Sequence, residues 1–195
     1  MKILGIGGSP RRGGNTDLIM KEILRGAGDA GHETEAVFLR DYTINSCTGC
    51  EKCRKDLTCT WFNDGMNLIY PKVEEADVMI LGSPVYNYNV TSIMKSFIDR
   101  LYPYYIFSDE SPRRYESRLV DRKRLAITFS VCEQTASEEM GFAEEAMSRP
   151  LEALGYQIYV SFPVCGFFDR GAILNKEKIV DEAYSLGKNL PEKIS

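Results

Sequence analysis

The chain lacks several features that mark whole classes of protein. None of its apolar runs approaches the length of a membrane-spanning helix, so we expect no membrane contact. It also has no excess of basic residues. Its 28 acidic residues outnumber 24 basic ones, and a net charge of −4 argues against nucleic acid as a main partner, because phosphate contacts need a basic face.

An export signal and a histidine-based acid or base are also missing. The opening residues, MKILGIGG, turn polar too soon for a signal peptide and are more typical of a first strand. We therefore expect a cytoplasmic protein with reduced cysteines, and we expect Cys132 and Cys165, which lie in apolar stretches, to be buried thiols. The single histidine, His32, follows Gly31 at a predicted helix exit and is expected on the surface, so we assign no catalytic side chain.

What the sequence does contain is a regular alternation of strands and helices. The strands are predicted at residues 2–6, 35–39, 78–82, 124–130 and 157–164, and the helices at 16–30, 65–76, 91–102, 138–154 and 176–190. This alternation predicts an α/β fold with an open, doubly wound, parallel five-stranded sheet and helices on both faces. We expect the strand order 2-1-3-4-5, one of the two common orders of such sheets. The chain shows no linker or repeat, so we expect a single domain over residues 1–195.

Two segments depart from the alternation, at about residues 42–63 and at 103–123. Both are longer than ordinary connections, and loops of this length are often functional. Residues 113–124 hold six Arg and Lys, which predicts either a solvated loop or a docking site for an acidic partner or a phosphate. Aromatic residues crowd around Pro103, where they either form a subunit interface or cap the edge of the sheet.

The first predicted strand is followed by GGSPRRGGNTD, which opens a helix. Such a turn aims backbone N–H groups and a helix N-terminus at an anion. Ser9, Asn15 and Thr16 add side-chain donors, and Arg11 or Arg12 adds positive charge. The segment has neither the Gly-Lys-Ser/Thr of a Walker A loop nor the third glycine of a dinucleotide fingerprint. It therefore predicts a site for a monophosphate ester.

The third predicted strand is followed by SPVYNYNVTSIMKSFIDR. In the order 2-1-3-4-5, ligands bind beyond the carboxyl ends of the first and third strands, so this segment and the phosphate loop should line one crevice. Proline and valine stiffen the turn so that its N–H groups meet a ring, tyrosines offer flat faces, and asparagines offer amide groups. The candidate residues for a planar heterocycle are Pro84, Val85, Tyr86, Asn87, Tyr88 and Asn89.

Four cysteines lie within thirteen residues, in the run CTGCEKCRKDLTC, and Gly49 lets the backbone between them curl with φ > 0. Overlapping C-x2-C steps are typical of iron–sulfur proteins, whereas structural zinc sites usually use two separated pairs. The gap of five residues before the last cysteine favours one 4Fe–4S cluster held by all four thiolates. A zinc site and a redox-inert or disulfide-prone loop remain as alternatives. The candidate ligands are Cys47, Cys50, Cys53 and Cys59.

These motifs together resemble the NADPH-dependent FMN reductase family of flavodoxin-like proteins, and the cysteine run resembles its iron–sulfur flavoprotein branch. The resemblance covers residues 1–102 well and implies non-covalent FMN, a 4Fe–4S cluster, and a homodimer or homotetramer. It implies a phosphate site formed by Ser9, Arg11, Asn15 and Thr16, a flavin-ring site formed by Pro84, Val85, Tyr86, Asn87 and Asn89, and cluster ligands Cys47, Cys50, Cys53 and Cys59. After the fourth strand many relatives have a glycine-rich loop, whereas this chain has FSVCEQTAS, so we assign no site residue from Ser130 to Thr135.

The function we expect is electron transfer by a flavoprotein oxidoreductase that contains FMN and 4Fe–4S. Electrons would come from ferredoxin or NAD(P)H and pass to a small acceptor such as a quinone, an oxygen species or another oxidant. Two alternatives remain. One is a cluster-free NAD(P)H-dependent FMN or quinone reductase, and the other is a non-catalytic electron carrier or redox sensor.

Overall fold

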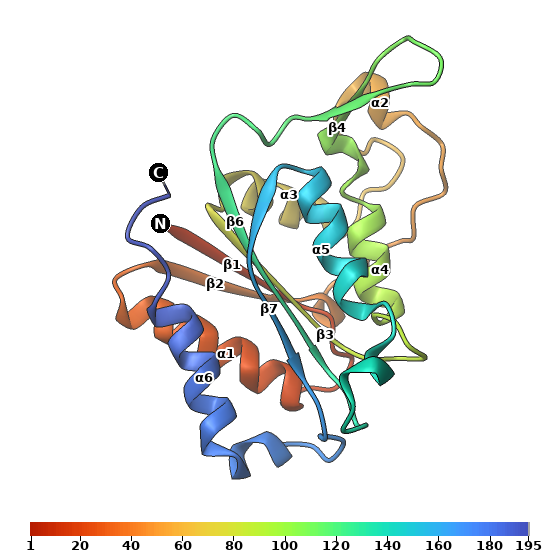
Figure 1. Ribbon diagram of the computed structural model, residues 1–195. Helices are drawn as coiled ribbons and strands as arrows, with labels where there is room; N and C mark the ends of the chain where they lie inside the picture. The colour runs from red at the N-terminus through yellow and green to blue at the C-terminus, as the bar shows by residue number, and fades with distance from the viewer. Residues whose placement is uncertain (195) are drawn as a thin grey trace.

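A five-stranded parallel sheet forms the middle layer of the structure, a computed structural model that describes residues 1–194 (Figure 1). Its strands are β1 (Lys2–Gly7), β2 (Glu33–Phe38), β3 (Val78–Pro84), β6 (Arg124–Val131) and β7 (Tyr156–Val164). They lie in the order β2-β1-β3-β6-β7. This is the order 2-1-3-4-5 in chain sequence, so the predicted fold class is confirmed.

Helices cover both faces of the sheet (Figure 1). On one face lie α1 (Asn15–Asp29) and α6 (Glu177–Lys188); on the other lie α3 (Met66–Glu75), α4 (Ser92–Asp99) and α5 (Ala143–Ala153). Side chains alternate between these faces along each strand. Ile3 joins the core beneath α1 and α6, whereas Leu4 and Ile6 join the core on the opposite face. All eight residues of β6, which lies between β3 and β7, are buried.

The predicted helix at 138–154 is interrupted in the structure. Its first part is a 3-10 helix, η3 (Ser137–Met140), and the α-helix begins only at Ala143. The break lies at Gly141, whose φ of 60° and ψ of −123° suit glycine and strain other residues. Its position brings the Phe142 N–H within 2.8 Å of the Tyr88 carbonyl oxygen, so the break ties this segment to the loop after β3.

The two insertions contain short elements that the sequence pattern does not predict. The cysteine segment includes α2 (Cys53–Asp56), and the second insertion continues from η2 (Tyr102–Tyr104) into an antiparallel hairpin of β4 (Tyr105–Phe107) and β5 (Tyr115–Ser117). The remaining short elements are η1 (Leu39–Asp41) and η4 (Ala172–Asn175).

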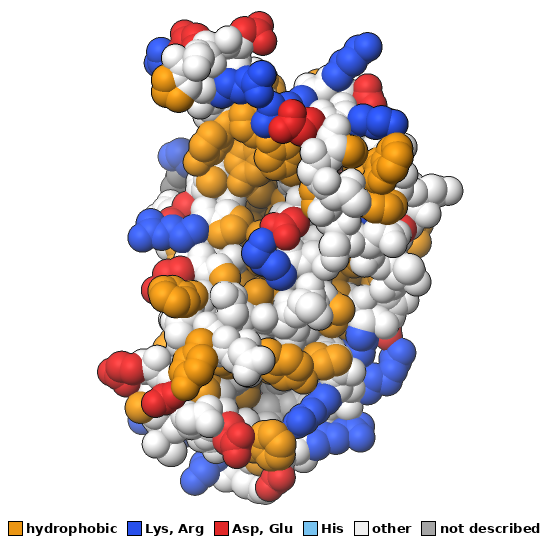
Figure 2. All heavy atoms as spheres, turned by 90° about the vertical axis from the view of Figure 1, so that its right-hand side faces the viewer, with side chains coloured by type: hydrophobic (Ala, Val, Ile, Leu, Met, Phe, Trp, Pro, Cys, Tyr) orange, Lys and Arg blue, Asp and Glu red, His pale blue; other side chains and the backbone are white. Residues whose placement is uncertain are grey.

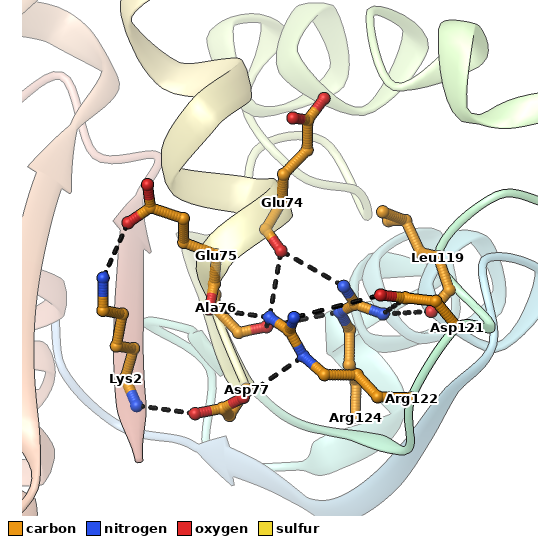
Figure 3. A network of polar contacts seen from close by, with 9 residues as sticks. All are labelled: Lys2, Glu74, Glu75, Ala76, Asp77, Leu119, Asp121, Arg122 and Arg124. Atoms are coloured by element: carbon orange, nitrogen blue, oxygen red, sulfur yellow. Dashed lines mark hydrogen bonds and ion pairs between the residues drawn. The ribbon is translucent and has the colours of Figure 1, made fainter.

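The basic end of the second insertion has a structural role. Figure 3 shows Arg122 and Arg124 reaching to the last turn of α3, where both donate hydrogen bonds to the carbonyls of Glu74 and Ala76. Arg124 is only 2% exposed, and its charge is balanced by Asp121. Cationic side chains at a helix C-terminus satisfy its free carbonyls and its dipole. Arg124 is therefore part of the buried fold, and Arg122, although exposed, is fastened to the same helix end.

The two cysteines outside the cysteine run differ in burial. Cys132 is 1% exposed, as expected, whereas Cys165 is only partly buried because it follows the last residue of edge strand β7. The prediction of two buried thiols is therefore wrong for Cys165. Within residues 1–194, the structure contains no helix long and apolar enough to span a membrane.

Candidate functional site

A cavity of about 490 Å³ opens at the carboxyl ends of the strands, between the loops that follow β1, β3, β6 and β7. Such a position is where open parallel sheets bind ligands. Eight of the nine predicted phosphate and ring residues line it, namely Ser9, Arg11, Asn15, Thr16, Pro84, Val85, Tyr86 and Asn87. Asn89 is not part of the lining, because its side chain accepts the N–H of Val90 and shapes the turn. Its contact with a ring stays a prediction.

The loop after β1 presents buried polar groups to this cavity. Ser9 and Thr16 are each 3% exposed, and Ser9 Oγ accepts the Arg11 N–H at 3.2 Å. Helix α1 begins after Gly14 with no side-chain cap. The N–H groups of an uncapped first turn point toward the place where an anion is best stabilised. The geometry therefore fits a phosphate group at this end of the cavity.

A buried ion pair between Arg40 and Asp17 supports the phosphate loop. Arg40 binds both carboxylate oxygens of Asp17, at 2.9 and 2.8 Å, and donates to the Ser9 carbonyl at 3.0 Å. Asp17 in turn accepts the Gly13 N–H at 2.7 Å. The sequence analysis missed this pair, because Arg40 lies beyond β2 and only the fold brings it beneath the loop.

Asn15 has partners that the sequence does not reveal. Its amide donates to the Asp169 carbonyl at 2.9 Å and accepts the Ile173 N–H at 3.2 Å. It therefore fastens the segment after β7 to the phosphate loop. Its predicted bond to a phosphate stays a prediction, and in this structure its side chain positions one wall of the cavity.

The loop after β3 is a tight, strained turn. Tyr86 and Asn89 exchange two backbone hydrogen bonds, and the residues between them, Asn87 and Tyr88, have φ of 48° and 63°. Left-handed backbone is costly for an aromatic residue and is often found at binding sites. The turn leaves Tyr86 44% exposed and Tyr88 59% exposed, so their rings are available at the cavity.

Several lining residues escaped the sequence analysis. Val131, Glu133 and Gln134 lie in the segment where no site residue was assigned, and Glu139, Phe167, Phe168 and Arg170 come from later loops. Arg11 lies over the Phe168 ring, with 4.9 Å between the guanidinium carbon and the ring centroid. Their only sequence signal is their position just after strands β6 and β7.

A second cavity, of about 210 Å³, is lined by all four clustered cysteines. Burial raises the pKa of Cys53, and the nearby Cys59 thiol raises it further. Gly49, Glu51 and Leu57 all have positive φ, so the backbone curls repeatedly around the cavity. The remaining wall combines aromatic with charged side chains, namely Trp61, Phe62, Tyr70 and Tyr102 with Glu51, Lys52, Asp99 and Arg100.

The four thiols are brought together, but not around one point. Among residues 1–194, no three His, Cys, Asp or Glu side chains are grouped so that they could hold a single metal ion. The ligands of one zinc ion share a single centre, whereas a cubane binds each thiolate at a separate iron. The structure thus brings the four thiols to one cavity, and their role as ligands of a zinc ion or of a cluster stays a prediction.

A buried ion pair between Asp64 and Arg100 holds the two ends of the cysteine segment together. Asp64 accepts the Asn45 N–H at 2.9 Å, the Met66 N–H at 3.1 Å and a hydrogen bond from Arg100 at 2.8 Å. Burial alone would raise the pKa of Asp64, but the bonds from Arg100 and Asn45 outweigh it and lower the pKa to about 2. Both ends of the segment are therefore fastened to α3 and to the end of α4.

The hairpin lies over the cysteine segment. The Arg54 guanidinium, next to Cys53, donates to the Tyr102 hydroxyl at 2.7 Å and lies 4.4 Å from the centroid of the Phe107 ring. Arg118 donates to the Leu57 carbonyl. In Figure 2, hydrophobic side chains gather in the upper part of the face, between groups of charged residues.

Helix α4 joins the two cavities. Its N-cap, Thr91, donates through its hydroxyl to the Gly8 carbonyl of the phosphate loop at 2.7 Å. The residue after its last turn, Arg100, lines the cysteine cavity. A helix of eight residues is about 12 Å long, so the two cavities lie near opposite ends of one short element.

Comparison with known sequences agrees with this geometry. A model of the NADPH-dependent FMN reductase family matches residues 1–135. An iron–sulfur flavoprotein from Methanocaldococcus jannaschii is 43% identical over 103 residues, and one from Archaeoglobus fulgidus is 44% identical over 104. Each match covers 53% of this chain, and the two cover 53% and 47% of those proteins. The chain thus matches about half the length of these curated relatives.

Comparison with solved structures supports the fold. An NAD(P)H:quinone oxidoreductase from Methanothermobacter marburgensis has a TM-score of 0.73 at 20% identity, over 98% of this chain and 99% of that one. A flavodoxin from the domain Archaea has a TM-score of 0.56 at 13% identity, over 97% and 95% of the two chains. The flavodoxin-like architecture therefore extends over nearly the whole chain.

Proposed function

The chain belongs to the NADPH-dependent FMN reductase family, and on that premise we propose that it is a flavoprotein oxidoreductase with FMN in the first cavity and a 4Fe–4S cluster in the second. The observation that carries the proposal is the convergence of all four clustered cysteines on one cavity, at the far end of the helix that starts beside the phosphate loop.

The residues of the first cavity fit FMN. The uncapped first turn of α1, with Ser9 and Thr16, would hold the phosphate, and Arg11 would add positive charge. The turn at 84–88 would hold the ring, with Tyr86 against its face and backbone N–H groups at its edge. No adenylate site is recognisable beside this loop, so FMN fits better than FAD.

The residues of the second cavity fit a cluster. Cys47, Cys50, Cys53 and Cys59 would supply thiolates. The aromatic side chains would cover one side of the group, because Cys53 and Cys59 are partly buried whereas Cys47 and Cys50 are exposed. When bound, FMN would exchange electrons in pairs or singly and the cluster one at a time, so together they would connect two-electron and one-electron partners. The protein itself supplies position and electrostatics.

The partners belong to the same proposal. Ferredoxin or NAD(P)H would donate electrons, and a quinone, an oxygen species or another small oxidant would accept them. The family and the iron–sulfur flavoprotein relatives support a redox role. The six free cysteines suit a reducing, cytoplasmic setting, and we propose a homodimer or homotetramer as the assembly.

Anaerobic reconstitution with iron and sulfide, followed by metal, sulfide and flavin analysis, tests the proposal. The wild type should take up iron and sulfide, and changing any one of Cys47, Cys50, Cys53 or Cys59 to Ala should lower both while FMN stays bound. Cys132→Ala and Cys165→Ala are matched controls that should keep the iron. If the wild type takes up no iron, a cluster-free NAD(P)H-dependent reductase is the better description. If the protein loaded with FMN and cluster shows no turnover even with ferredoxin supplied, a role as an electron carrier or redox sensor is the better description.

A further inference from the structure

Arg100 is a buried cation at the wall of the cysteine cavity. It follows the last turn of α4, is 2% exposed, and lines the cavity together with the four cysteines. A buried guanidinium must have its charge balanced and its N–H groups bonded. The Asp64 carboxylate balances this charge, and both terminal nitrogens of Arg100 donate to its oxygens, at 2.8 and 3.2 Å.

The hydrogen bonds of Arg100 are incomplete. Nη1 also donates to the Asn45 carbonyl at 2.9 Å, but Nε is buried and has no hydrogen-bond partner in the part of the chain that the structure describes. A buried N–H without an acceptor is costly and uncommon in folded proteins. The Phe62 ring lies 5.0 Å from the guanidinium carbon, so one face of the group is occupied by an aromatic ring.

The cavity indicates what the missing acceptor is. Besides Arg100 and the four thiols, its walls carry aromatic side chains, Tyr70 among them, and the carboxylates of Glu51 and Asp99. Glu51 pairs with Arg54, Asp99 pairs with Lys95 and the Tyr70 hydroxyl donates to the Arg100 carbonyl, which leaves the thiols as the acceptors not engaged in these pairs. We propose that Arg100 is a ligand-contacting residue of this cavity, whose Nε–H donates a hydrogen bond to a sulfur atom of the bound cluster, either a cysteine thiolate or an inorganic sulfide. This inference rests on the proposed 4Fe–4S cluster and assigns a role to a residue outside the cysteine motif.

The bond has a definite electrostatic effect. Because Asp64 already neutralises the Arg100 charge, the group acts on the cluster mainly as an N–H donor. Hydrogen bonds to cluster sulfurs are among the factors that set reduction potentials, and a donor favours the reduced cluster because that form carries more negative charge. Arg100 therefore raises the reduction potential of the cluster.

The alternative is that Arg100 has only a structural role and holds the ends of the cysteine segment together through its bonds to Asp64 and Asn45. A lysine at this position separates the two roles, because its ammonium can still pair with Asp64 but has no Nε–H and no planar fork. Arg54→Lys is the matched control. Arg54 lies next to the ligand Cys53, but its guanidinium is bonded to the Tyr102 hydroxyl and it is not part of the cavity lining.

The first experiment uses wild-type protein labelled with ¹⁵N at the arginine Nε and reconstituted with iron and sulfide. Pulsed EPR of the reduced cluster should show a ¹⁵N hyperfine coupling. The coupling should disappear in labelled Arg100→Lys and remain in labelled Arg54→Lys. Because the main measurement is made on the wild type, poor folding of a variant does not affect it.

The second experiment is an EPR-monitored redox titration of the same three proteins. At a fixed potential, Arg100→Lys should lower the ratio of reduced to oxidised cluster at least about tenfold, which is a shift of about 59 mV for a one-electron couple. Arg54→Lys should titrate like the wild type.

The outcomes separate the two proposals. A wild type that takes up no iron overturns the cluster proposal and this inference with it. A wild type that loads its cluster but shows no ¹⁵N coupling leaves the cluster proposal standing and overturns the role of Arg100 alone. An unchanged potential in folded, loaded Arg100→Lys overturns the role of Arg100 as well.

Discussion

At the scale of single residues, Thr16 is a buried polar side chain that lines the first cavity. It is 3% exposed in the first turn of α1 and lines the cavity, so its hydroxyl is held where only a ligand or the adjacent backbone can reach it. Asp64 has a structural role instead, because its carboxylate accepts hydrogen bonds from Asn45, Met66 and Arg100 and so fastens the cysteine segment. Thr16 can therefore be tested by measuring FMN binding, and Asp64 by measuring the stability of the fold.

We expect Thr16→Ala to weaken FMN binding by roughly 1–3 kcal/mol, the range for losing a hydrogen bond to a charged group. Thr16→Ser keeps the hydroxyl and should bind nearly as the wild type does. Fluorescence titration of flavin-free protein with FMN measures the effect. FAD that binds as tightly as FMN, or equal affinities for all three proteins, would contradict the proposed phosphate site.

Asp64 should make stability depend on pH in the acid range. Its pKa of about 2 in the folded protein lies below the ordinary value of 3.8, so its contribution is complete above about pH 4 and is lost as the pH falls toward 2. The pH-dependent part is about 2 kcal/mol. Urea unfolding of iron-free wild type and Asp64→Asn at several pH values measures it. The difference between the two proteins should shrink as the pH falls; a constant difference would show that Asp64 is not held ionised.

At the scale of elements, α1 and α6 pack with their backbones unusually close. A Cβ atom on Gly26 would lie 2.0 Å from the Tyr184 carbonyl oxygen, and one on Gly187 would lie 1.8 Å from the Ile23 carbonyl oxygen. This contact holds α1, and with it the phosphate loop at its N-terminus, against the sheet. Gly28, in the same helix, has only Thr34 nearby, at 3.9 Å.

Gly26→Ala should therefore destabilise the protein by roughly 1–3 kcal/mol, because neither backbone can move away without separating the helices. Gly28→Ala is the matched control and should be neutral or stabilising by up to about 1 kcal/mol, because alanine favours the helix. Thermal or urea unfolding of the two variants gives both values. Equal effects would mean that the helices are not in close contact in solution.

At the scale of the whole molecule, the hairpin presents aromatic surface. Tyr105, Phe107 and Tyr115 form a cluster of rings, and Ile106 and Tyr115 are 49% and 54% exposed. Tyr104 is different, because it is 2% exposed and belongs to the core. The aromatic run around Pro103 is therefore divided between a core part and an exposed hairpin part. The role of the hairpin part as a subunit interface stays a prediction.

We expect light scattering at micromolar concentration to give at least twice the mass of the chain. Ile106→Lys combined with Tyr115→Lys should lower that mass, because two charges would have to be buried in an interface. Leu68→Lys, at an equally exposed position on α3, is the control and should leave it unchanged. A monomeric wild type would contradict an interface at the hairpin.

From the sequence alone, the strands of the main sheet, the main helices between them and the two candidate binding motifs can be located. Each of these is a property of a short stretch, because strand and helix periods, glycine turns and cysteine spacing are local. The motifs therefore contain the eight predicted FMN residues that line the first cavity and all four cysteines that line the second.

The residues that complete each candidate site from distant parts of the chain become visible only in the folded structure. Arg40 reaches the phosphate loop from beyond β2, Phe168 comes from the loop after β7, and Arg100 meets the cysteine segment from the end of α4. Contacts of this kind depend on how elements pack, and no spacing in the sequence encodes them. For the same reason, Asn15 and Arg124 have structural partners that their local sequence did not reveal.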